Sequence, residues 1–571
     1  MKATEAKLLD FLKKSPQFIV PIYQRDYAWG LPQCARLWAD ILRAGKSEET
    51  QAHFLGSIVY VEQGIYQVSS QASLLIIDGQ QRLTTLSLLL EALARAVGDT
   101  EPMEGFSAKK IRSYYLQNPL EEGDKSYKLL LRAADRDTLC AIVKQKEAPL
   151  EKPSQRLIQN FQFFEEKIKG LGGNFGPLCR GLAKLIIVDI ALSRDQDNPQ
   201  LIFESLNSTG LDLAQADLIR NFLLMGLAPH HQQTLYLNYW QLMEQRLSQE
   251  SSHSGSRFDA FMRDYLTLKT GTIPKIHEVY EAFKAYAHTQ PVMQAGIEAL
   301  MGDMHRFTAH YCAMVLDEEK DKELSAAFSD LRELKADVVW PFLLELYEDY
   351  KKGILPHKHF LRAVRLVESY IFRRFVCGIP TNTLNKTFAS FPRHLDKKRY
   401  LESIEEHFLR LTSNRRFPRN SEFEKAIKER DLYTVRRRCK YLLRRLENHG
   451  RKEPVLVEEY TIEHILPQNE NLSEAWRKAL GPDWKRIQQE WVHTLGNLTL
   501  TGYNSEYSDR PFPEKRDMPG GFRESPLRLN QGLAEVAVWN EEAIKARADR
   551  LAKLALEIWP EPQPAALYQR A

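Results

Sequence analysis

The feature that most constrains the fold is a long region, from about Pro229 to Lys452, in which leucines and aromatic residues recur at helical spacing. Segments such as Leu331 to Tyr350 and His359 to Phe375 are amphipathic and contain few alternating β-branched residues. Apolar residues that recur every three to four positions place one face of a helix against a core. The middle of the chain is therefore predicted to be mainly helical, with its aromatic side chains in the core.

Before this helical region, from Met1 to about Ala228, short apolar runs alternate with helical stretches. Gly56 to Val61 and Leu185 to Ile190 have the pattern of strands, which indicates a mixed α/β domain. A chain of 571 residues is long enough for several domains. We predict an α+β, multidomain protein divided into residues 1–228, 229–412 and 413–571.

A glycine turn near the N-terminus lies between an apolar run and a leucine-rich stretch. Leu74 to Ile77 are followed by the motif DGQQRLTT, and the leucine-rich stretch then runs to Leu93. This order predicts a buried strand, a turn at Gly79 and an amphipathic helix. Free backbone N–H groups at the start of a helix, with Arg82 beside them, can cradle a phosphate.

Two neighbouring segments strengthen this phosphate-site hypothesis. In Ile19 to Trp29, Gln24 and Arg25 stand among aromatic residues, a mixture that can contact phosphates and stack on a base. In His53 to Tyr60, which is predicted to be a strand, Gly56 permits close approach to the backbone. The chain has no Walker-type glycine-lysine loop, so a nucleotide would bind in another way.

Near the C-terminus an acid, a histidine and two asparagines have the spacing that a one-metal nuclease requires. EHILPQ spans Glu463 to Gln468, and LGNLTLTGYN follows at Leu495 to Asn504. Apolar runs flank both segments, as in the paired strands of a ββα-metal (HNH) domain. Phosphodiester hydrolysis at neutral pH needs a base that titrates near that pH, which histidine supplies, and a Lewis acid.

The predicted roles follow from this chemistry. His464 is the candidate general base, and Asn497 is the residue expected to hold its imidazole. Glu463 and the amide of Asn504 are the candidate metal ligands, and their hard oxygen atoms suit Mg²⁺ or Mn²⁺ better than Zn²⁺. A single histidine is usually structural, so it is the complete constellation that favours catalysis.

Basic residues are concentrated directly before this motif. Between Ser413 and Lys452, Lys and Arg strongly outnumber Asp and Glu, as expected of a surface that faces phosphates. A solvated basic helix is the alternative, because Tyr441 and Leu442 could pack inward on its other face. Lys515 could contact a phosphate or pair with an acid. The candidate DNA-binding residues are Arg436, Arg437, Lys440, Arg444 and Lys515.

Several of these strings resemble one known family. PIYQRDYAW, HFLGSIV, IIDGQQRLTTL and IFESLNSTGLDLAQADLIRNFLL are similar to the N-terminal domain of the GmrSD family of type IV, modification-dependent restriction enzymes. EHILPQ, LGNLTL, Asn504 and Lys515 are similar to the C-terminal HNH-type domain of that family. In one departure, Glu463 stands where many HNH enzymes have aspartate.

The resemblance implies a ParB-like N-terminal fold that binds and hydrolyses a nucleoside triphosphate (NTP), GTP or another, and a C-terminal domain that cuts or nicks DNA. The expected function is NTP-regulated, modification-dependent cleavage of double-stranded DNA in defence against phage or foreign DNA. Two alternatives stay open: a nucleotide-switched DNA-binding protein with a degenerate nuclease motif, and an RNA-cleaving effector. The implied nucleotide-binding residues are Gln24, Arg25, Asp78, Gly79, Gln80, Gln81, Arg82 and Asn207.

Net charge, cysteine positions and apolar runs limit which partners, sites and locations are expected. The net charge of +4 is too small to identify a nucleic-acid partner by itself. The six cysteines are scattered, so neither a zinc site nor a disulfide framework is expected. The chain has neither the apolar core of a signal peptide nor a run of membrane-spanning length, and we expect a cytoplasmic protein without a membrane partner. The modification sensed, the preferred NTP and the formation of a homo-oligomer stay open.

Overall fold

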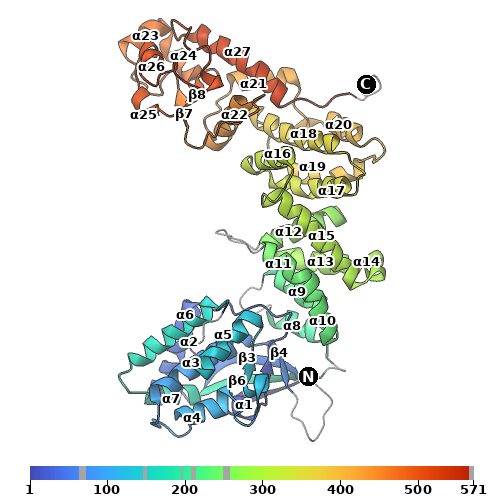
Figure 1. Ribbon diagram of the computed structural model, residues 1–571, viewed down its shortest axis with the longest axis vertical. Coiled ribbons are helices and arrows are strands. Elements are labelled where there is room, and N and C mark those ends of the chain that lie inside the picture. The colour runs from blue at the N-terminus through green and yellow to red at the C-terminus, as the bar shows by residue number, and fades with distance from the viewer. Residues whose placement is uncertain (63–72, 146–150, 194–196, 208–213, 248–256, 565–571) are drawn as a thin grey trace. The chain divides into compact units, whose positions relative to one another are not determined.

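The computed structural model of the chain (Figure 1) describes residues 1–62, 73–145, 151–193, 197–207, 214–247 and 257–564. The chain forms two compact units. The N-terminal unit comprises Met1–Asp259 and Phe283–Met301, and the C-terminal unit comprises Ala260–Ala282 and Gly302–Ala571. The α+β, multidomain prediction is confirmed, and the predicted helical middle region is shared between the two units.

The N-terminal unit is built on a six-stranded mixed sheet with the order β1-β6-β3-β4-β2-β5. Strands β6 and β3 run parallel, whereas β1 is antiparallel to β6 and β4 is antiparallel to β3. Strands β3 and β6 include the two segments predicted as strands. The bounds are β1 (Lys2–Lys7), β2 (Phe18–Ile19), β3 (His53–Glu62), β4 (Leu74–Asp78), β5 (Leu129–Leu130) and β6 (Leu185–Leu192).

The strand, glycine turn and helix predicted around DGQQR are present as β4, Gly79 and α3 (Gln80–Val97). Gly79 has a φ of 100°, a value that strains residues with a side chain, and it lets the chain turn directly from strand to helix. The helix differs from the amphipathic prediction, because it is buried on nearly all sides. Its leucines share one core with the strands, while α4 (Ala108–Ile111), α5 (Ala133–Lys144) and α6 (Gln155–Lys169) pack against it.

The other helices that begin before residue 297 belong to the N-terminal unit, except that residues 260–282 belong to the C-terminal unit (Figure 1). They are α1 (Leu8–Lys14), α2 (Leu31–Lys46), α7 (Gly176–Ala183), α8 (Pro199–Asn207), α9 (Gln215–Leu224), α10 (Pro229–Leu235), α11 (Gln241–Leu247), α12 (Arg257–Thr270), α13 (Val279–Ala287) and α14 (Gln290–Ala295). No helix in the described ranges combines the length and the apolar surface that a membrane span requires.

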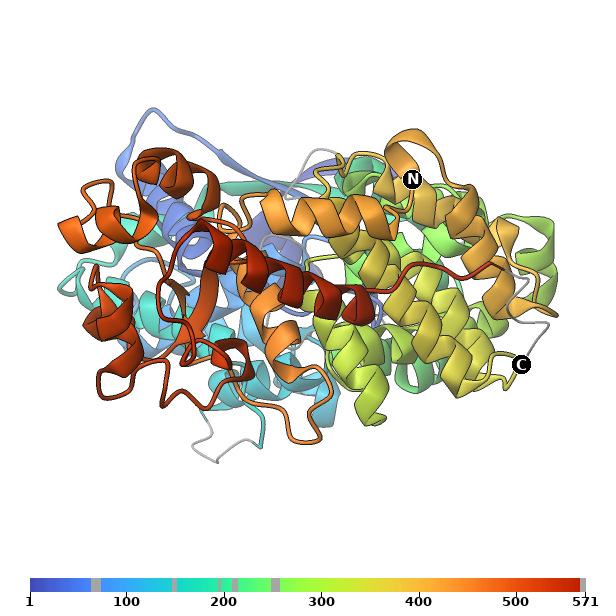
Figure 2. The ribbon, with the colours of Figure 1, turned by 90° about the horizontal axis from the view of Figure 1, so that it is seen from above.

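The C-terminal unit is mainly helical. Its elements are α15 (Ile297–Val315), α16 (Lys322–Glu333), α17 (Trp340–Lys351), α18 (His357–Val376), α19 (Leu384–Ser390), α20 (Tyr400–Arg410), α21 (Asn420–Glu429), α22 (Arg436–Asn448), β7 (Thr461–His464), α23 (Glu474–Leu480), α24 (Trp484–Trp491), β8 (Leu498–Thr501), α25 (Asn504–Tyr507), α26 (Phe512–Asp517) and α27 (Glu541–Ile558). Helix α18 is central, because α16, α17, α20 and α21 all contact it. The C-terminal helix α27 lies alongside α21 and α22 (Figure 2).

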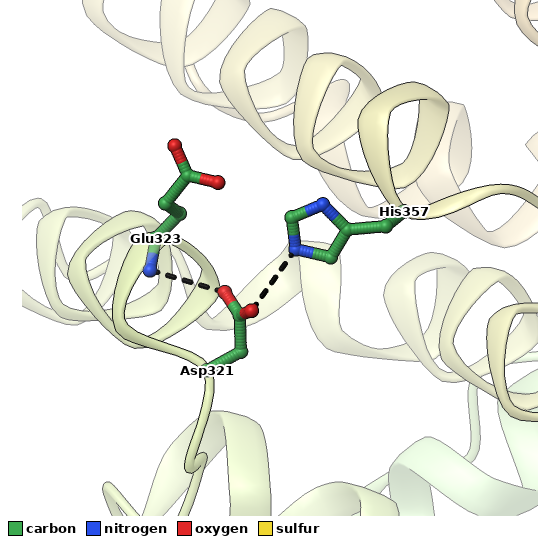
Figure 3. A group of neighbouring side chains, drawn as sticks. All are labelled: Asp321, Glu323 and His357. Carbon is green, nitrogen blue, oxygen red and sulfur yellow. Dashed lines mark hydrogen bonds and ion pairs between the residues drawn. The ribbon is translucent and has the colours of Figure 1, made fainter.

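Asp321 joins two of these helices (Figure 3). Its Oδ1 accepts hydrogen bonds from the backbone N–H groups of Glu323 and Leu324 and so caps α16. Its Oδ2 lies 3.2 Å from Nε2 of His357 in the first turn of α18. Among the described residues, Asp321, Glu323 and His357 form the one His, Cys, Asp and Glu group with metal-ligand spacing. Helix N-termini favour a carboxylate and oppose a cation, so we interpret this group as a helix cap.

Candidate active site

The first two residues of the motif EHILPQ are the last two residues of strand β7, which pairs antiparallel with β8. The register places His464, the last residue of β7, opposite Leu498, the first residue of β8. The two strands are not joined by a tight hairpin, because α23 and α24 lie between them in the chain. Helix α25 follows β8 at once, so the predicted order of strand, strand and helix is present.

The side chain of Asn497 is completely buried and forms hydrogen bonds with backbone groups and with the indole of Trp539. Its Oδ1 accepts hydrogen bonds from the Leu466 N–H at 2.7 Å and from Trp539 Nε1 at 3.1 Å. Its Nδ2 donates to the carbonyl groups of Leu466 and Val492. These bonds use the full capacity of an amide side chain. The prediction that Asn497 holds the His464 imidazole directly is therefore corrected. Asn497 instead fixes the loop that follows the histidine.

The His464 imidazole is buried and lies against a second histidine. Its Nε2 is 3.0 Å from Nδ1 of His493. The ring of Tyr433 stacks on His493 at a centroid distance of 5.3 Å and meets the His464 ring edge-on at 4.6 Å. Burial, and then the charges of His493 and Lys515, lower the pKa of His464 to about 3. The ring is therefore neutral at physiological pH, and one of its nitrogen atoms keeps a lone pair.

Sequence reasoning missed His493 and Tyr433. His493 stands shortly before Asn497 in the chain, and this nearness to the LGNLTL motif was the available signal. Tyr433 belongs to the segment between α21 and α22, where nothing in the local pattern marks an aromatic residue as part of a site. Only packing brings its ring onto the imidazole pair.

Glu463 is buried on the opposite face of β7 from His464, because successive strand residues alternate. Its Oε1 lies 2.7 Å from Lys515 Nζ, and Lys515 also donates to the carbonyl groups of His464 and Ile465. Burial raises the pKa of the Glu463 carboxyl and lowers the pKa of the Lys515 ammonium, although each charge favours the other. Lys515 has no exposed surface, so the DNA contact predicted for it is corrected.

Asn504 begins α25 and bonds back to β7. Its Nδ2 donates to Thr461 Oγ1 and to the carbonyl group of Ile462, which leaves its Oδ1 as the atom that could meet a cation. Glu463 fits a metal site less well than predicted, since its carboxylate faces away from the histidine and is engaged in an ion pair. Asn504 lies beside the start of β7, whereas His464 ends this strand. The protein donor for a hard cation at the start of β7 is thus one amide oxygen, and phosphate oxygens and water would complete the shell.

The basic residues of α22 fall into two groups, and Arg444 belongs to the inner one. Its Nη2 lies 2.5 Å from both Asp330 Oδ1 and Glu333 Oε2. Arg365 and Arg445 also bind Asp330. Burial alone would raise the pKa of Asp330, but the three guanidinium groups lower it. The DNA contact predicted for Arg444 is therefore corrected, because its charge is compensated inside the protein.

Arg436, Arg437 and Lys440 form the outer group. Arg437 and Lys440 each donate to a backbone carbonyl group, and within the described residues none of the three forms an ion pair. Arg436 is exposed, and its guanidinium lies 5.1 Å from the centre of the Tyr433 ring that covers the two histidines. Arg436 is thus a candidate phosphate contact beside the imidazoles.

Arg436→Ala and Arg444→Ala are expected to differ. Loss of Arg436 removes one phosphate contact, so we expect weaker DNA binding and a slope of log K against log [salt] that is smaller by about 1. Loss of Arg444 lowers the free energy of unfolding by about 2 kcal/mol, less than for an isolated buried pair, because two arginines still bind Asp330. Fluorescence anisotropy over a salt series and urea denaturation separate the two effects. An unchanged salt slope in Arg436→Ala would contradict the DNA contact.

Three of the predicted nucleotide-binding residues are buried glutamines that join two motifs. Gln24 Nε2 donates to a carbonyl group of β4, at 2.8 Å. The amide groups of Gln80 and Gln81 bind backbone groups of residues 25–29. These side chains hold the segment PIYQRDYAW against the start of α3. In this structure they position the loop and are not open to a nucleotide.

Arg82, in contrast, spans the first turn of α3 and strand β3. Its Nη1 donates to the Ser57 carbonyl at 2.5 Å and lies 3.5 Å from Asp78 Oδ2. Gly56 has a φ of 125°, which strains any residue with a side chain, and a Cβ atom there would lie 3.0 Å from the Arg82 guanidinium. The close approach predicted at Gly56 is confirmed, and the group that approaches is a side chain of the protein.

Arg25 is half-buried beside the same turn. Burial lowers the pKa of its guanidinium, and the carboxylates of Asp217 and Asp78 partly offset this. Asn207 ends α8, but its side chain lies outside the described residues. Asp78, Arg25 and Arg82 are therefore the predicted residues that remain partly accessible at the start of α3, whereas Gly79 is buried. A cavity of about 820 Å³ lies at the other end of this helix, beside Arg95.

Two protein-family models match the chain, and each match contains one of the two candidate sites. Residues 7–224 match the family model of the GmrSD restriction endonuclease, N-terminal domain. Residues 417–554 match the model of the GmrSD restriction endonucleases, C-terminal domain. The first match contains the DGQQR turn and the second contains the imidazole pair. No curated protein matches the chain.

Proposed function

This chain belongs to the GmrSD restriction endonuclease family, and we propose that it is an NTP-regulated, modification-dependent DNA endonuclease or nickase. Membership of a restriction endonuclease family itself supports a nuclease that acts on DNA in defence against phage. The proposal adds a ββα-metal (HNH) mechanism, control by an NTP and dependence on a DNA modification. The observation that carries its catalytic part is the buried imidazole of His464 at the end of β7, with its Nε2 3.0 Å from Nδ1 of His493.

His464 would accept a proton from the water that attacks the phosphorus atom. A pKa of about 3 keeps its ring unprotonated and able to accept that proton. An anionic phosphodiester bound beside the ring would favour the imidazolium form and raise this pKa, which makes the ring a stronger base. Asn497 supports the step from a distance by fixing the loop after His464.

A divalent cation, Mg²⁺ or Mn²⁺, belongs to the proposal because it would neutralise charge on the reacting phosphate. Asn504 would hold it through Oδ1. Glu463 would take part only if its ion pair with Lys515 opened. The hard oxygen donors are the reason for preferring these ions to Zn²⁺.

The N-terminal unit is proposed to bind the NTP, GTP or another, at the start of α3, with a ParB-like fold. Backbone N–H groups in the first turn of a helix form an anion site, and Gly79 brings the strand directly into that turn. Arg82 and Arg25 supply positive charge at the same place. The proposed regulation rests on this phosphate-binding chemistry.

The experiment that tests the proposal uses the full chain with matched modified and unmodified supercoiled plasmids. Mg²⁺ or Mn²⁺ and each triphosphate are added or withheld, and nicking, linearisation and phosphate release are recorded. We expect metal-dependent breakage of the modified plasmid, changed in rate by one triphosphate. In Arg82→Ala we expect the effect of the triphosphate to disappear while metal-dependent breakage stays. Equal breakage of both plasmids, insensitive to every triphosphate, would refute modification dependence and NTP control.

A nucleotide-switched DNA-binding protein is the second candidate. The observation that favours it is the engagement of Glu463, a predicted metal ligand, by Lys515. Such a protein would shift the mobility of the plasmid without changing its topology, under every combination of metal and triphosphate.

A further inference from the structure

We infer that His493 is the residue that orients the His464 imidazole, by accepting a hydrogen bond at Nδ1 from Nε2–H of His464. His464 is then left with Nδ1 as its one basic nitrogen. The inference rests on the proposed nuclease function and adds a positioning residue to it. It gives to a second histidine the role that the motif pattern had suggested for Asn497.

The first step is the contact itself. His464 Nε2 and His493 Nδ1 are 3.0 Å apart, a normal hydrogen-bond distance for two ring nitrogens. Within the described residues, His493 Nδ1 is the one side-chain atom hydrogen-bonded to the His464 ring. Asn497 cannot take this place, because its four hydrogen-bonding positions are filled by Leu466, Val492 and Trp539.

The second step is the direction of the hydrogen bond. A neutral imidazole has one N–H group and one lone pair, so one ring must donate and the other accept. If His493 donated, the lone pair of His464 at Nε2 would be occupied and its Nδ1 would carry the proton. His464 would then have no nitrogen free to accept a proton from water. If His464 donates from Nε2, its Nδ1 keeps the lone pair, and only this arrangement is compatible with a general base.

The third step concerns how His493 itself is held in place. The carbonyl group of His493 accepts a hydrogen bond from the Leu432 N–H at 3.0 Å. The ring of Tyr433, the next residue, is within 7° of parallel to the His493 ring and stacks on it. The imidazole of His493 is thus fixed by its backbone on one side and by an aromatic face on another. A histidine held in this way can set the ring position and tautomer of its neighbour.

The buried Asn497 connects the two backbone segments that carry His464 and His493. Its amide binds Leu466, two residues after His464, and Val492, one residue before His493. One side chain therefore sets the spacing of the two backbone segments that carry the imidazoles. Asn497 can thus influence the position of the His464 imidazole without a hydrogen bond to that ring.

The test compares His493→Leu with His493→Asn in the full chain. Leucine removes the acceptor, whereas the Oδ1 atom of asparagine lies near the position of histidine Nδ1 and can accept in its place. For plasmid nicking we expect His493→Leu to lower kcat by on the order of 100-fold or more, with KM nearly unchanged. We expect His493→Asn to recover most of the loss. Equal kcat in His493→Leu and the wild type, or equal losses in the two variants, would overturn the inference.

A second measurement does not depend on activity. Nitrogen NMR of the histidine-labelled full chain reports which ring nitrogen carries the proton, and the His464 signal is identified by its absence in His464→Gln. We expect an unprotonated Nδ1 in the wild type and in His493→Asn, and loss of this single tautomer in His493→Leu. A protonated Nδ1 in the wild type would reject the hydrogen-bond direction. If the wild type nicks no plasmid, the proposed function fails, while the NMR result still decides the tautomer.

Discussion

His464→Ala is expected to abolish DNA breakage, with a loss of at least about 10³-fold in the rate of plasmid nicking. The physical reason is that this buried ring at the end of β7 is held neutral and can accept a proton from water. Removal of the imidazole leaves water as the proton acceptor at the phosphate. The rate is measured as nicking of a supercoiled plasmid with saturating Mg²⁺ or Mn²⁺.

Two controls separate chemistry from folding in this experiment. His464→Gln keeps a polar side chain of similar length and should be equally inactive, since an amide is not a base at neutral pH. His449→Ala removes a partly exposed histidine that pairs with Glu557, and it should nick at the rate of the wild type. Both variants, like His464→Ala, should still bind DNA and the triphosphate. Retained nicking by pure His464→Ala protein would remove His464 from the mechanism.

Lys515→Met is expected to destabilise the C-terminal unit by about 3–5 kcal/mol, because it leaves the Glu463 carboxyl buried without its charge partner. Glu463→Gln should have a cost of the same kind, since the ammonium is then unpaired. The double variant Glu463→Gln, Lys515→Met removes both charges and should recover most of the stability. Urea denaturation measures the free energy of unfolding of each variant, and hydrogen exchange of β7 and α26 shows where in the unit stability is lost.

The pH dependence of Lys515→Met gives an independent check. Burial raises the pKa of Glu463 in the folded protein, and the loss of Lys515 raises it further. The unfolded chain then releases this proton at a lower pH than the folded protein does, so stability falls as pH rises above the ordinary carboxyl pKa of about 4. The penalty of Lys515→Met should therefore be smaller near pH 4 than at pH 7. A larger penalty at the lower pH would contradict the burial of an unpaired carboxyl.

An exposed pair gives the matched control. Arg510 lies 3.5 Å from Glu514 near the same helix, and both side chains are about half exposed. Solvent screens such a pair, so Arg510→Met should leave urea denaturation unchanged. If Lys515→Met behaved in the same way as Arg510→Met, Lys515 would not be a buried partner of Glu463, and a role at the DNA surface would be open to it again.

Features that depend on neighbouring residues were predictable from the sequence. The run from Leu74 through Gly79 specifies a strand, a turn and a helix, since only glycine tolerates the backbone angle at that junction. The helical spacing of the middle region and the order of β7, β8 and α25 follow from local periodicity in the same way. The sequence also indicated the candidate residues of both motifs, because their types and spacing suit the expected chemistry.

What each of these side chains touches was decided by the tertiary structure. Lys515 and Arg444 resembled DNA contacts in the sequence, but packing places each beside a carboxylate that is distant in the chain. His493 and Tyr433 have no pattern of their own and become part of the site only because the segments before β8 and α22 pack onto His464. The sequence thus determined the local elements and the identity of the chemical groups, since these depend on nearest neighbours. The tertiary structure decided the partners, since long-range pairing and burial depend on how the elements pack.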